Sequence, residues 1–286
     1  MNNLSDIGTI KDILSRHGFH FSKALGQNFL VNPSVCPRMA EECGVDSESG
    51  VIEIGAGIGV LTVELAKRAK KVVCIELDTR LLPILDETLK DYDNIEIVND
   101  DVLKVDLHKL IAEKFAGMKV YVCANLPYYI TSPVIMKLLE ERLPIEAITV
   151  MVQKESAARL CAEVGSRQSG AVTVAVDYYS QAQKLFDVSA GSFMPPPKVN
   201  SSVIRLDVRK EPPIEVADEK LFFRIVHAAF GQRRKTALNS VSSGSGIEKT
   251  AVAAALEDCG FDPNIRAESM TMQELAMLTQ AIAQRI

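Results

Sequence analysis

The sequence predicts an α/β protein in which a mostly parallel sheet is followed by a small helical domain. Five short apolar runs rich in Val and Ile recur from residue 51 onward: "VIEIG", "KVVCIEL", "IEIV", "KVYVCAN" and "AITVMVQ". Stretches with helical spacing of apolar residues separate them, such as "GVLTVELAKRAK" and "TRLLPILDETLKDY". This alternation is typical of βαβ units, and the near-continuous apolarity of each run indicates strands covered on both faces.

The pattern changes after residue 165. The stretch "AVTVAVDYYSQAQKLFDV" and the later "SSVIRLDVR" are rich in β-forming residues, with a Pro-rich turn between them. They predict a hairpin-like addition, with an antiparallel strand, at the sheet edge. Helical patterns then return in "DEKLFFRIVHAAF", "RRKTALNSV", "EKTAVAAALEDCG" and "TMQELAMLTQAIAQRI". With the proline pair at 212–213 as the boundary, we expect a sheet domain over 1–210, including an N-terminal extension over 1–20, and a helical domain over 211–286.

Composition excludes several protein classes. The chain has 286 residues, 47% of them hydrophobic, as a packed globular protein requires. No apolar run reaches the roughly 18 residues of a membrane helix, and the polar start lacks the features of a signal peptide. We therefore expect a cytoplasmic protein without a membrane partner. The six cysteines form no C-x-x-C pair and have no histidines at zinc spacing, so no metal site is predicted.

Charge is unevenly distributed. The net charge of -5 argues against a protein that coats nucleic acid without discrimination. Residues 220–247 nevertheless contain no Asp or Glu, and we call them the cationic segment. Its basic residues are Lys220, Arg224, Arg233, Arg234 and Lys235. From charge alone, this segment is either a binding surface or a solvated helix face.

A glycine-rich loop, "EIGAGIGV", follows the first apolar run and precedes a helical stretch. Gly55, Gly57 and Gly59 allow a tight turn and a close approach of a ligand to the backbone. The dinucleotide fingerprint needs glycine at position 60, where this chain has Val60. The loop therefore favours a nucleoside without a pyrophosphate over NAD, although a glycine turn without any ligand is the simpler alternative.

Acidic residues follow the next two runs. Glu76 is placed where a carboxylate can accept both hydroxyls of a ribose. In "NDDVL", Asp100 or Asp101 can accept a hydrogen bond from an adenine amino group, although Asp clusters are also common in turns. Open α/β sheets bind ligands at the carboxyl ends of their strands, where these residues are expected. The pattern is similar to the S-adenosylmethionine site of a Rossmann-like methyltransferase.

The stretch "NLPYYITSPV" ends the fourth apolar run. In isolation its Asn and Pro indicate a turn. Beside a methyl donor, however, the side-chain oxygen of Asn125 and the carbonyl of Leu126 can hold the hydrogens of an amine with a delocalised lone pair. Pro127 stiffens the loop, and Tyr128 can stack on a base. The stretch resembles the [DNS]-x-P-[YFW] motif of amino-methylating enzymes, so we interpret it as a catalytic loop.

Several blocks together carry a more specific resemblance. They are "SKALGQNFLVNP", "EIGAGIG", "CIELD", "NLPYYITSPV", "MVQKE", "FMPPPKVNSSV" and "AFGQRRKTALNSV", in this order. Over residues 20–285 the chain resembles the KsgA/RsmA family of ribosomal small-subunit RNA adenine dimethyltransferases. The resemblance implies a class I methyltransferase sheet and transfer of methyl groups from S-adenosylmethionine to the N6 amines of two adjacent adenosines. These lie in the 3′-terminal hairpin loop of 16S rRNA, in the 30S subunit or its precursor, and we expect a monomeric enzyme.

The resemblance also implies roles for residues. Cofactor contacts fall on Asn28, Leu30, Gly55, Gly57, Glu76, Asp101 and Asn125. The base is held by Asn125, Leu126, Pro127 and Tyr128, and Phe193 closes its other face. Arg233, Arg234 and Lys235 of "FGQRRK" are expected to bind RNA phosphates. No metal and no dedicated catalytic base are implied, because positioning dominates an in-line displacement at a sulfonium methyl group.

Two positions depart from the family pattern. Asp100-Asp101 stands where Gly-Asp is common, and Asn32 stands where an Asp is common. We choose Asp101 as the residue facing the cofactor adenine because "DVL" then aligns with the family's D-A-L.

Three alternatives remain. The first is the sister family that dimethylates one adenine of 23S rRNA and confers macrolide resistance, but it typically reads Asn-Ile-Pro-Tyr and lacks "AFGQRRKT". The second is a protein glutamine methyltransferase, which typically reads Asn-Pro-Pro-Tyr. The third is a non-catalytic RNA-binding or assembly factor on the same fold, against which the intact cofactor and "NLPY" motifs argue.

Overall fold

The computed structural model describes residues 4–22, 26–232 and 234–286. By their mutual contacts these residues divide into two compact units. The sheet unit comprises residues 1–157 and 182–208, and the helical unit comprises residues 158–181 and 209–286. The helical unit thus includes residues 158–181, a stretch within the 1–210 domain that the sequence predicts.

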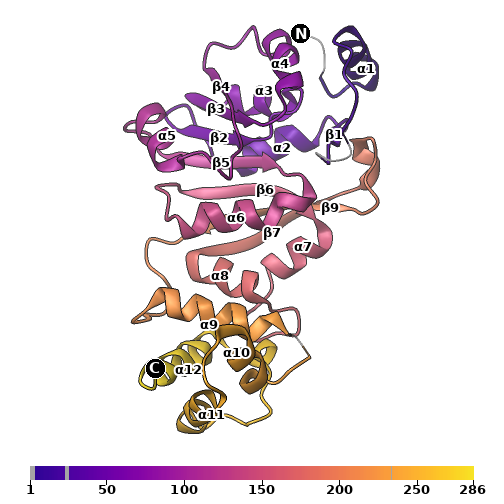
Figure 1. The fold of residues 1–286 in the computed structure, drawn as a ribbon. Helices are drawn as coiled ribbons and strands as arrows, with labels where there is room; N and C mark the ends of the chain where they lie inside the picture. Colours follow the sequence, from indigo (N-terminus) through magenta and orange to yellow (C-terminus); the bar gives the residue numbers. More distant parts are fainter. Residues whose placement is uncertain (1–3, 23–25, 233) are drawn as a thin grey trace. The chain divides into compact units, whose positions relative to one another are not determined.

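The sheet unit is built on seven strands in the order β4-β3-β2-β5-β6-β9-β7 (Figure 1). Their bounds are β2 Gly50–Ile54, β3 Lys71–Glu76, β4 Ile95–Asn99, β5 Val120–Asn125, β6 Ala147–Gln153, β7 Ser180–Val188 and β9 Ser201–Val208. The pairs β2–β3, β3–β4, β2–β5 and β5–β6 are parallel, and β9 runs antiparallel to β6. All five expected parallel strands are present, which confirms the predicted α/β class and the antiparallel addition at the sheet edge.

The order of strands reverses at β2. Along the chain, β3 and β4 extend the sheet on one side of β2, and β5 and β6 extend it on the other. Such a switch point leaves a crevice at the carboxyl ends of the two central strands. The register places Ile54, the last residue of β2, opposite Ile75 of β3 and Ala124 of β5, so the loops after these three strands start side by side.

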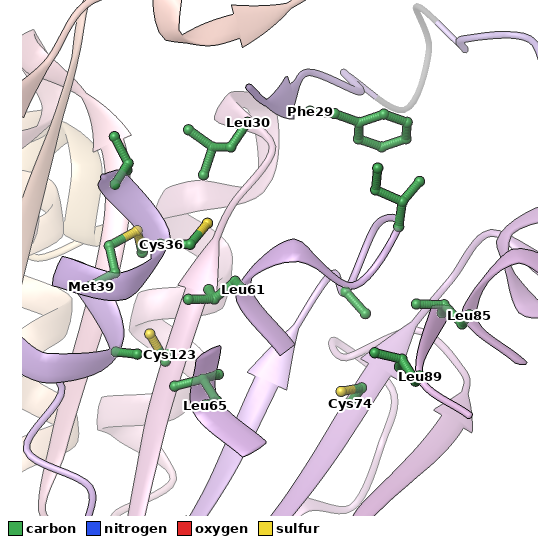
Figure 2. Packing of buried hydrophobic residues seen from close by; sticks show 14 of the residues in the cluster. Phe29, Leu30, Cys36, Met39, Leu61, Leu65, Cys74, Leu85, Leu89 and Cys123 are labelled. Atoms are coloured by element: carbon green, nitrogen blue, oxygen red, sulfur yellow. The ribbon is translucent and has the colours of Figure 1, made fainter. Parts of the chain in front are cut away.

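Helices connect the strands. They are α1 Ile7–Arg16, α2 Val35–Glu42, α3 Val60–Ala66, α4 Leu82–Thr88, α5 Leu107–Lys114, α6 Thr131–Glu140 and α7 Lys154–Leu160. Figure 2 shows how α2 and α3 contribute Met39, Leu61 and Leu65 to the core beside the strands. Cys74 and Cys123 are fully buried there and serve as small core residues.

A second, two-stranded sheet joins segments far apart in the sequence. β1 (Phe29–Leu30) pairs antiparallel with β8 (Phe193–Met194), and Leu30 lies opposite Phe193. The "GQNFL" and "FMPPPKV" blocks are therefore physically connected, which the sequence analysis did not predict.

The helical unit contains the four predicted C-terminal helices. They are α9 Glu219–Gly231, α10 Ala237–Ser245, α11 Lys249–Asp258 and α12 Met272–Ala283. Side-chain N-caps from Asp218, Thr236 and Thr271 begin three of them, as is typical of these residue types. Among the helices of the described chain, none is long and apolar enough to cross a membrane.

One predicted element was wrong. The stretch "AVTVAVDYY" forms α8 (Ala171–Tyr179) rather than a strand, whereas the following "SQAQKLFDV" is β7 as predicted. The alternating valines imitate the period of a strand. The last six residues of α8 include five buried side chains, at positions 174–176, 178 and 179, so the usual polar stripe that reveals a helix is absent from its second half. Tyr178 and Tyr179 pack against Phe222 and Phe223 of α9.

Candidate functional site

The predicted cofactor-binding and catalytic residues come together in one pocket of the sheet unit. The pocket lies at the carboxyl ends of β2, β3 and β5. Its lining includes every one of them: Asn28, Leu30, Gly55, Gly57, Glu76, Asp101, Asn125, Leu126, Pro127, Tyr128 and Phe193. The expectation that these residues lie together at the strand ends is thus met by the structure, and their individual roles stay predictions.

Glu76 is fixed by the glycine loop. The amide of Gly57 donates to its Oε2 at 3.1 Å, and the amide of Asp78 donates to its Oε1 at 2.9 Å. Gly57 has a φ of +60°, a conformation that glycine adopts without strain. Burial raises the pKa of the Glu76 carboxyl, although the two amide hydrogen bonds act in the opposite direction. The carboxylate is thus held in one orientation at the pocket wall.

The "GQNFL" block is held in place by a residue that the sequence analysis did not assign to the site. Gln27 donates from Nε2 to Oδ2 of Asp78 at 2.7 Å. Asp78 also accepts from the Arg80 guanidinium, which holds the pKa of this carboxyl below its usual value. Oδ1 of Asp78 accepts from the Arg80 amide as well, so this side chain caps the short 3₁₀ turn that follows β3. The side chain of Asn28 donates to the carbonyl of Gly26 at 3.0 Å.

The "NLPY" loop begins on a strand and ends in a helical turn. Asn125 is the last residue of β5, and a short 3₁₀ turn starts at Tyr128. The side chain of Leu126 is buried, so its backbone carbonyl is its polar contribution to the loop. The hydroxyl of Tyr128 forms a 2.8 Å hydrogen bond with Ser201 of β9, and burial raises the pKa of Tyr128. This bond fixes the tilt of the ring.

Phe193 reaches the pocket through its pairing with Leu30. It is 4% exposed and lines the same pocket as Tyr128. The pairing of β1 with β8 sets its position, so a residue far along the chain is placed by the "GQNFL" segment.

Both candidate aspartates after β4 line the pocket. Asp100 accepts from the Asp101 amide at 2.7 Å, and Asp101 accepts from the Leu103 amide at 3.0 Å. Asp101 is half-buried, whereas Asp100 is exposed. The choice of Asp101 over Asp100 stays a prediction.

Sequence reasoning missed Glu53 of β2, which lines the pocket at 1% exposure. Its Oε2 accepts from the thiol of Cys74 at 3.3 Å. Burial raises the pKa of the Glu53 carboxyl to about 7. The signal in the sequence was a charged residue inside an otherwise apolar run, "VIEIG".

The cationic segment, residues 220–247, contains all of α9 except its first residue and the whole of α10. Arg234 and Lys235 are exposed beyond the end of this helix, whereas Arg233 lies outside the described residues. Arg224 donates from Nε to the carbonyl of Ser245 at 3.2 Å, so it serves the end of α10. The exposed pair therefore fits a binding surface, and Arg224 has a structural contact.

Residues 18–284 match the family model described as ribosomal RNA adenine dimethylase. The chain belongs to this family of dimethylases. Among its curated relatives is the ribosomal RNA small subunit methyltransferase A of Geobacillus thermodenitrificans (strain NG80-2). It is 50% identical over 279 residues, which are 96% of this chain and 95% of the relative. The protein of the same description from Bacillus mycoides (strain KBAB4) is 46% identical over 286 residues, which are 99% and 98% of the two chains.

Solved structures agree with this membership. A dimethyladenosine transferase from Plasmodium falciparum superposes with a TM-score of 0.73 at 26% identity, over 90% of this dimethylase and 98% of that chain. The 23S rRNA methyltransferase ErmE superposes with a TM-score of 0.66 at 28% identity, over 90% and 100% of the chains. The dimethylase is thus an enzyme that methylates adenine in ribosomal RNA on a class I methyltransferase sheet, as the sequence motifs predicted.

Proposed function

We propose that this dimethylase transfers methyl groups from S-adenosylmethionine to the N6 amines of two adjacent adenosines in the 3′-terminal hairpin loop of 16S rRNA. The observation that carries the proposal is the placement of "NLPY" in the same pocket as the glycine loop and Glu76. The names of the relatives, which specify the small subunit, support the choice of 16S rRNA.

The residues present fit S-adenosylmethionine. The fixed carboxylate of Glu76 is suited to the two hydroxyls of a ribose, and Asp101 to the amino group of adenine. The glycine loop permits a close approach to the backbone, and Asn28 and Leu30 complete the wall. When bound, this donor supplies an electrophilic methyl group on a sulfonium.

The catalytic loop positions the acceptor. The side-chain oxygen of Asn125 and the carbonyl of Leu126 accept the hydrogens of the amine, which directs its lone pair at the methyl group. Tyr128 stacks on the base and Phe193 closes the other face, so the adenine must leave its stack in the RNA. After attack the nitrogen is positively charged and acidic, so water can take the proton.

The proposed substrate is 16S rRNA within the 30S subunit or its precursor. Arg233, Arg234 and Lys235 bind phosphates of this RNA, and the acidic remainder of the chain limits unspecific binding. We propose that the protein acts as a cytoplasmic monomer during ribosome biogenesis.

A second candidate is methylation of adenine in 23S rRNA. The similarity to ErmE favours it, because that structure covers 90% of this chain with a TM-score of 0.66. The higher identity to relatives named for the small subunit makes it the weaker candidate.

The test uses labelled donor and 30S particles from a strain that lacks the modification. We expect Asn125→Ala to lower methyl transfer about a hundredfold or more, because a preorganised acceptor is lost, while particle binding is retained. Asn264→Ala, an exposed asparagine in the helical unit, is the matched control and should keep full activity. Full activity of Asn125→Ala would refute its assigned role.

Primer extension on both rRNAs from a knockout strain decides between the two substrates. Loss of modification on 16S rRNA is the expected result. Loss on 23S rRNA alone would overturn the proposed substrate in favour of the second candidate.

A further inference from the structure

The helical unit contains a cavity that the proposed mechanism does not use. It has a volume of about 330 Å³ and lies at the N-terminus of α8, opposite residues near the end of α9. Because one water takes roughly 30 Å³ in the liquid, the cavity has room for a phosphate group with accompanying water. Its side chains with polar or titratable groups come from Arg159, Gln168, Ser169, Thr173 and His227.

Hydrogen-bond donors are concentrated in this cavity. The nine-residue helix α8 starts after Gly170, which has no side chain to accept from the first-turn amides. These amides carry the positive end of the helix dipole. Arg159 and His227 are exposed and add cationic or donor groups, and no carboxylate lines the cavity among the described residues.

Ser169 gives an independent sign of a ligand. It is 1% exposed and lines the cavity, and its Oγ has no hydrogen-bond partner among the described residues. A buried hydroxyl without a partner is costly, so such groups call for an explanation. Neighbouring groups are occupied elsewhere: the hydroxyl of Thr173 accepts from the Gly170 amide and donates to the carbonyl of Arg159.

We propose that this cavity is a phosphate site that binds a backbone phosphodiester of the ribosomal RNA. The first-turn amides of α8 and the Ser169 hydroxyl donate to the phosphate oxygens, and Arg159 neutralises the charge. Three lining residues, His227, Phe230 and Gly231, belong to the cationic segment, so the site includes part of that segment. This inference rests on the proposed function in that the RNA is its ligand, and it adds a contact outside the catalytic pocket.

Position 170 offers a sharp test because a side chain there can replace the phosphate. Gly170 has an extended backbone with φ −157°, and a Cβ would come no closer than 3.9 Å to Thr173 Oγ1. Gly170→Asp therefore introduces a carboxylate that caps the first-turn amides and repels phosphate. Gly170→Ala is the matched control, since it leaves the amides uncapped, and Gly170→Asn separates capping from charge.

Binding is measured with unmethylated 30S particles over a range of salt concentrations. We expect Gly170→Asp to weaken binding about tenfold or more and to lower the slope of log affinity against log salt by roughly one. Gly170→Ala should bind within about twofold of the natural chain, and Gly170→Asn should lie between them. The thermal unfolding temperature of Gly170→Asp should equal or exceed that of Gly170→Ala, which shows that the fold is intact. Equal affinities and equal salt slopes for the Asp and Ala variants would overturn the inference.

Amide NMR signals of Ala171 and Val172 identify the ligand. We expect them to shift with a hairpin RNA that carries the 3′ loop, at concentrations far below those at which inorganic phosphate shifts them. A response to inorganic phosphate alone would overturn the assignment to RNA. If the natural chain methylates 30S particles while Gly170→Asp binds them unimpaired, this inference fails and the proposed function stands. If the natural chain fails to methylate them, the proposed function itself fails.

Discussion

At the scale of single residues, two buried glutamates of one pocket are held differently. Glu76 accepts from two backbone amides, whereas Glu53 accepts from the side chains of Thr62 and Cys74. Burial raises the pKa of Glu53, and these two side-chain hydrogen bonds oppose the rise only in part. Its pKa of about 7 means that it carries a proton at mildly acidic pH.

This shift has a consequence for stability. The pKa of Glu53 rises from 4.5 in the unfolded chain to about 7 in the folded one, so the folded state binds the proton more tightly. The tighter proton binding of Glu53 adds up to about 3 kcal/mol to the free energy of unfolding. This stabilisation is fully present below pH 4.5 and is lost as the pH rises to about 7. We expect Glu53→Gln to flatten this part of the pH dependence in urea unfolding between pH 5 and 8. The exposed Glu113→Gln is the control, and an unchanged profile in Glu53→Gln would contradict the assignment.

At the scale of elements, an apolar pattern predicts a strand or helix correctly where nearly all residues of that element share one environment. The five parallel strands were predictable because each is an apolar run covered on both faces. Helix α8 was not, because its alternating valines match the period of a strand and its second half has little polar surface. The pairing of β1 with β8 was not predictable either, since two-residue strands have no period.

The packing of α10 on α9 depends on Gly244. A Cβ at this position would lie 2.9 Å from both Cα and Cβ of Ala228. Replacing a helical glycine with alanine usually stabilises by about 1 kcal/mol, whereas overpacking costs about 1–3 kcal/mol. Because the clash involves backbone, we expect Gly244→Ala to lower the free energy of unfolding. Denaturant unfolding of Gly244→Ala measures this change, and Gly191→Ala, where a Cβ has ordinary space, is the control. A higher free energy of unfolding in Gly244→Ala would contradict the close packing of α10 on α9.

At the scale of the whole molecule, the sequence located the pocket but not the contacts that support it. The glycine loop and "NLPY" were recognisable because each has a fixed chemistry at the end of a strand. The bonds from Gln27 to Asp78 and from Tyr128 to Ser201 join residues that no local pattern relates. Such contacts arise from the fold, so only the structure assigns them.

The balance of charge over the molecule predicts how binding responds to salt. An acidic protein with a cationic segment should bind RNA mainly through that segment. We expect joint replacement of Arg233, Arg234 and Lys235 by Gln to reduce the salt slope of 30S binding by roughly 2 to 3, since each phosphate contact contributes roughly 0.7 to 0.9.

The matched control replaces three exposed lysines elsewhere, Lys11, Lys90 and Lys249, by Gln. It changes the net charge equally and should leave most of the slope in place. An equal loss of slope in both triple variants would show that net charge, rather than the cationic segment, governs binding.

The pairing of Leu30 with Phe193 limits how far the chain can be shortened. Removing everything up to residue 30 leaves each strand of the seven-stranded sheet intact, yet it takes away the strand that β8 pairs with. The backbone groups of β8 then lose their partners, and Phe193 loses the neighbour that holds it over the pocket. For protein engineering, the shortest fragment that keeps the pocket therefore includes Gly26, its first lining residue.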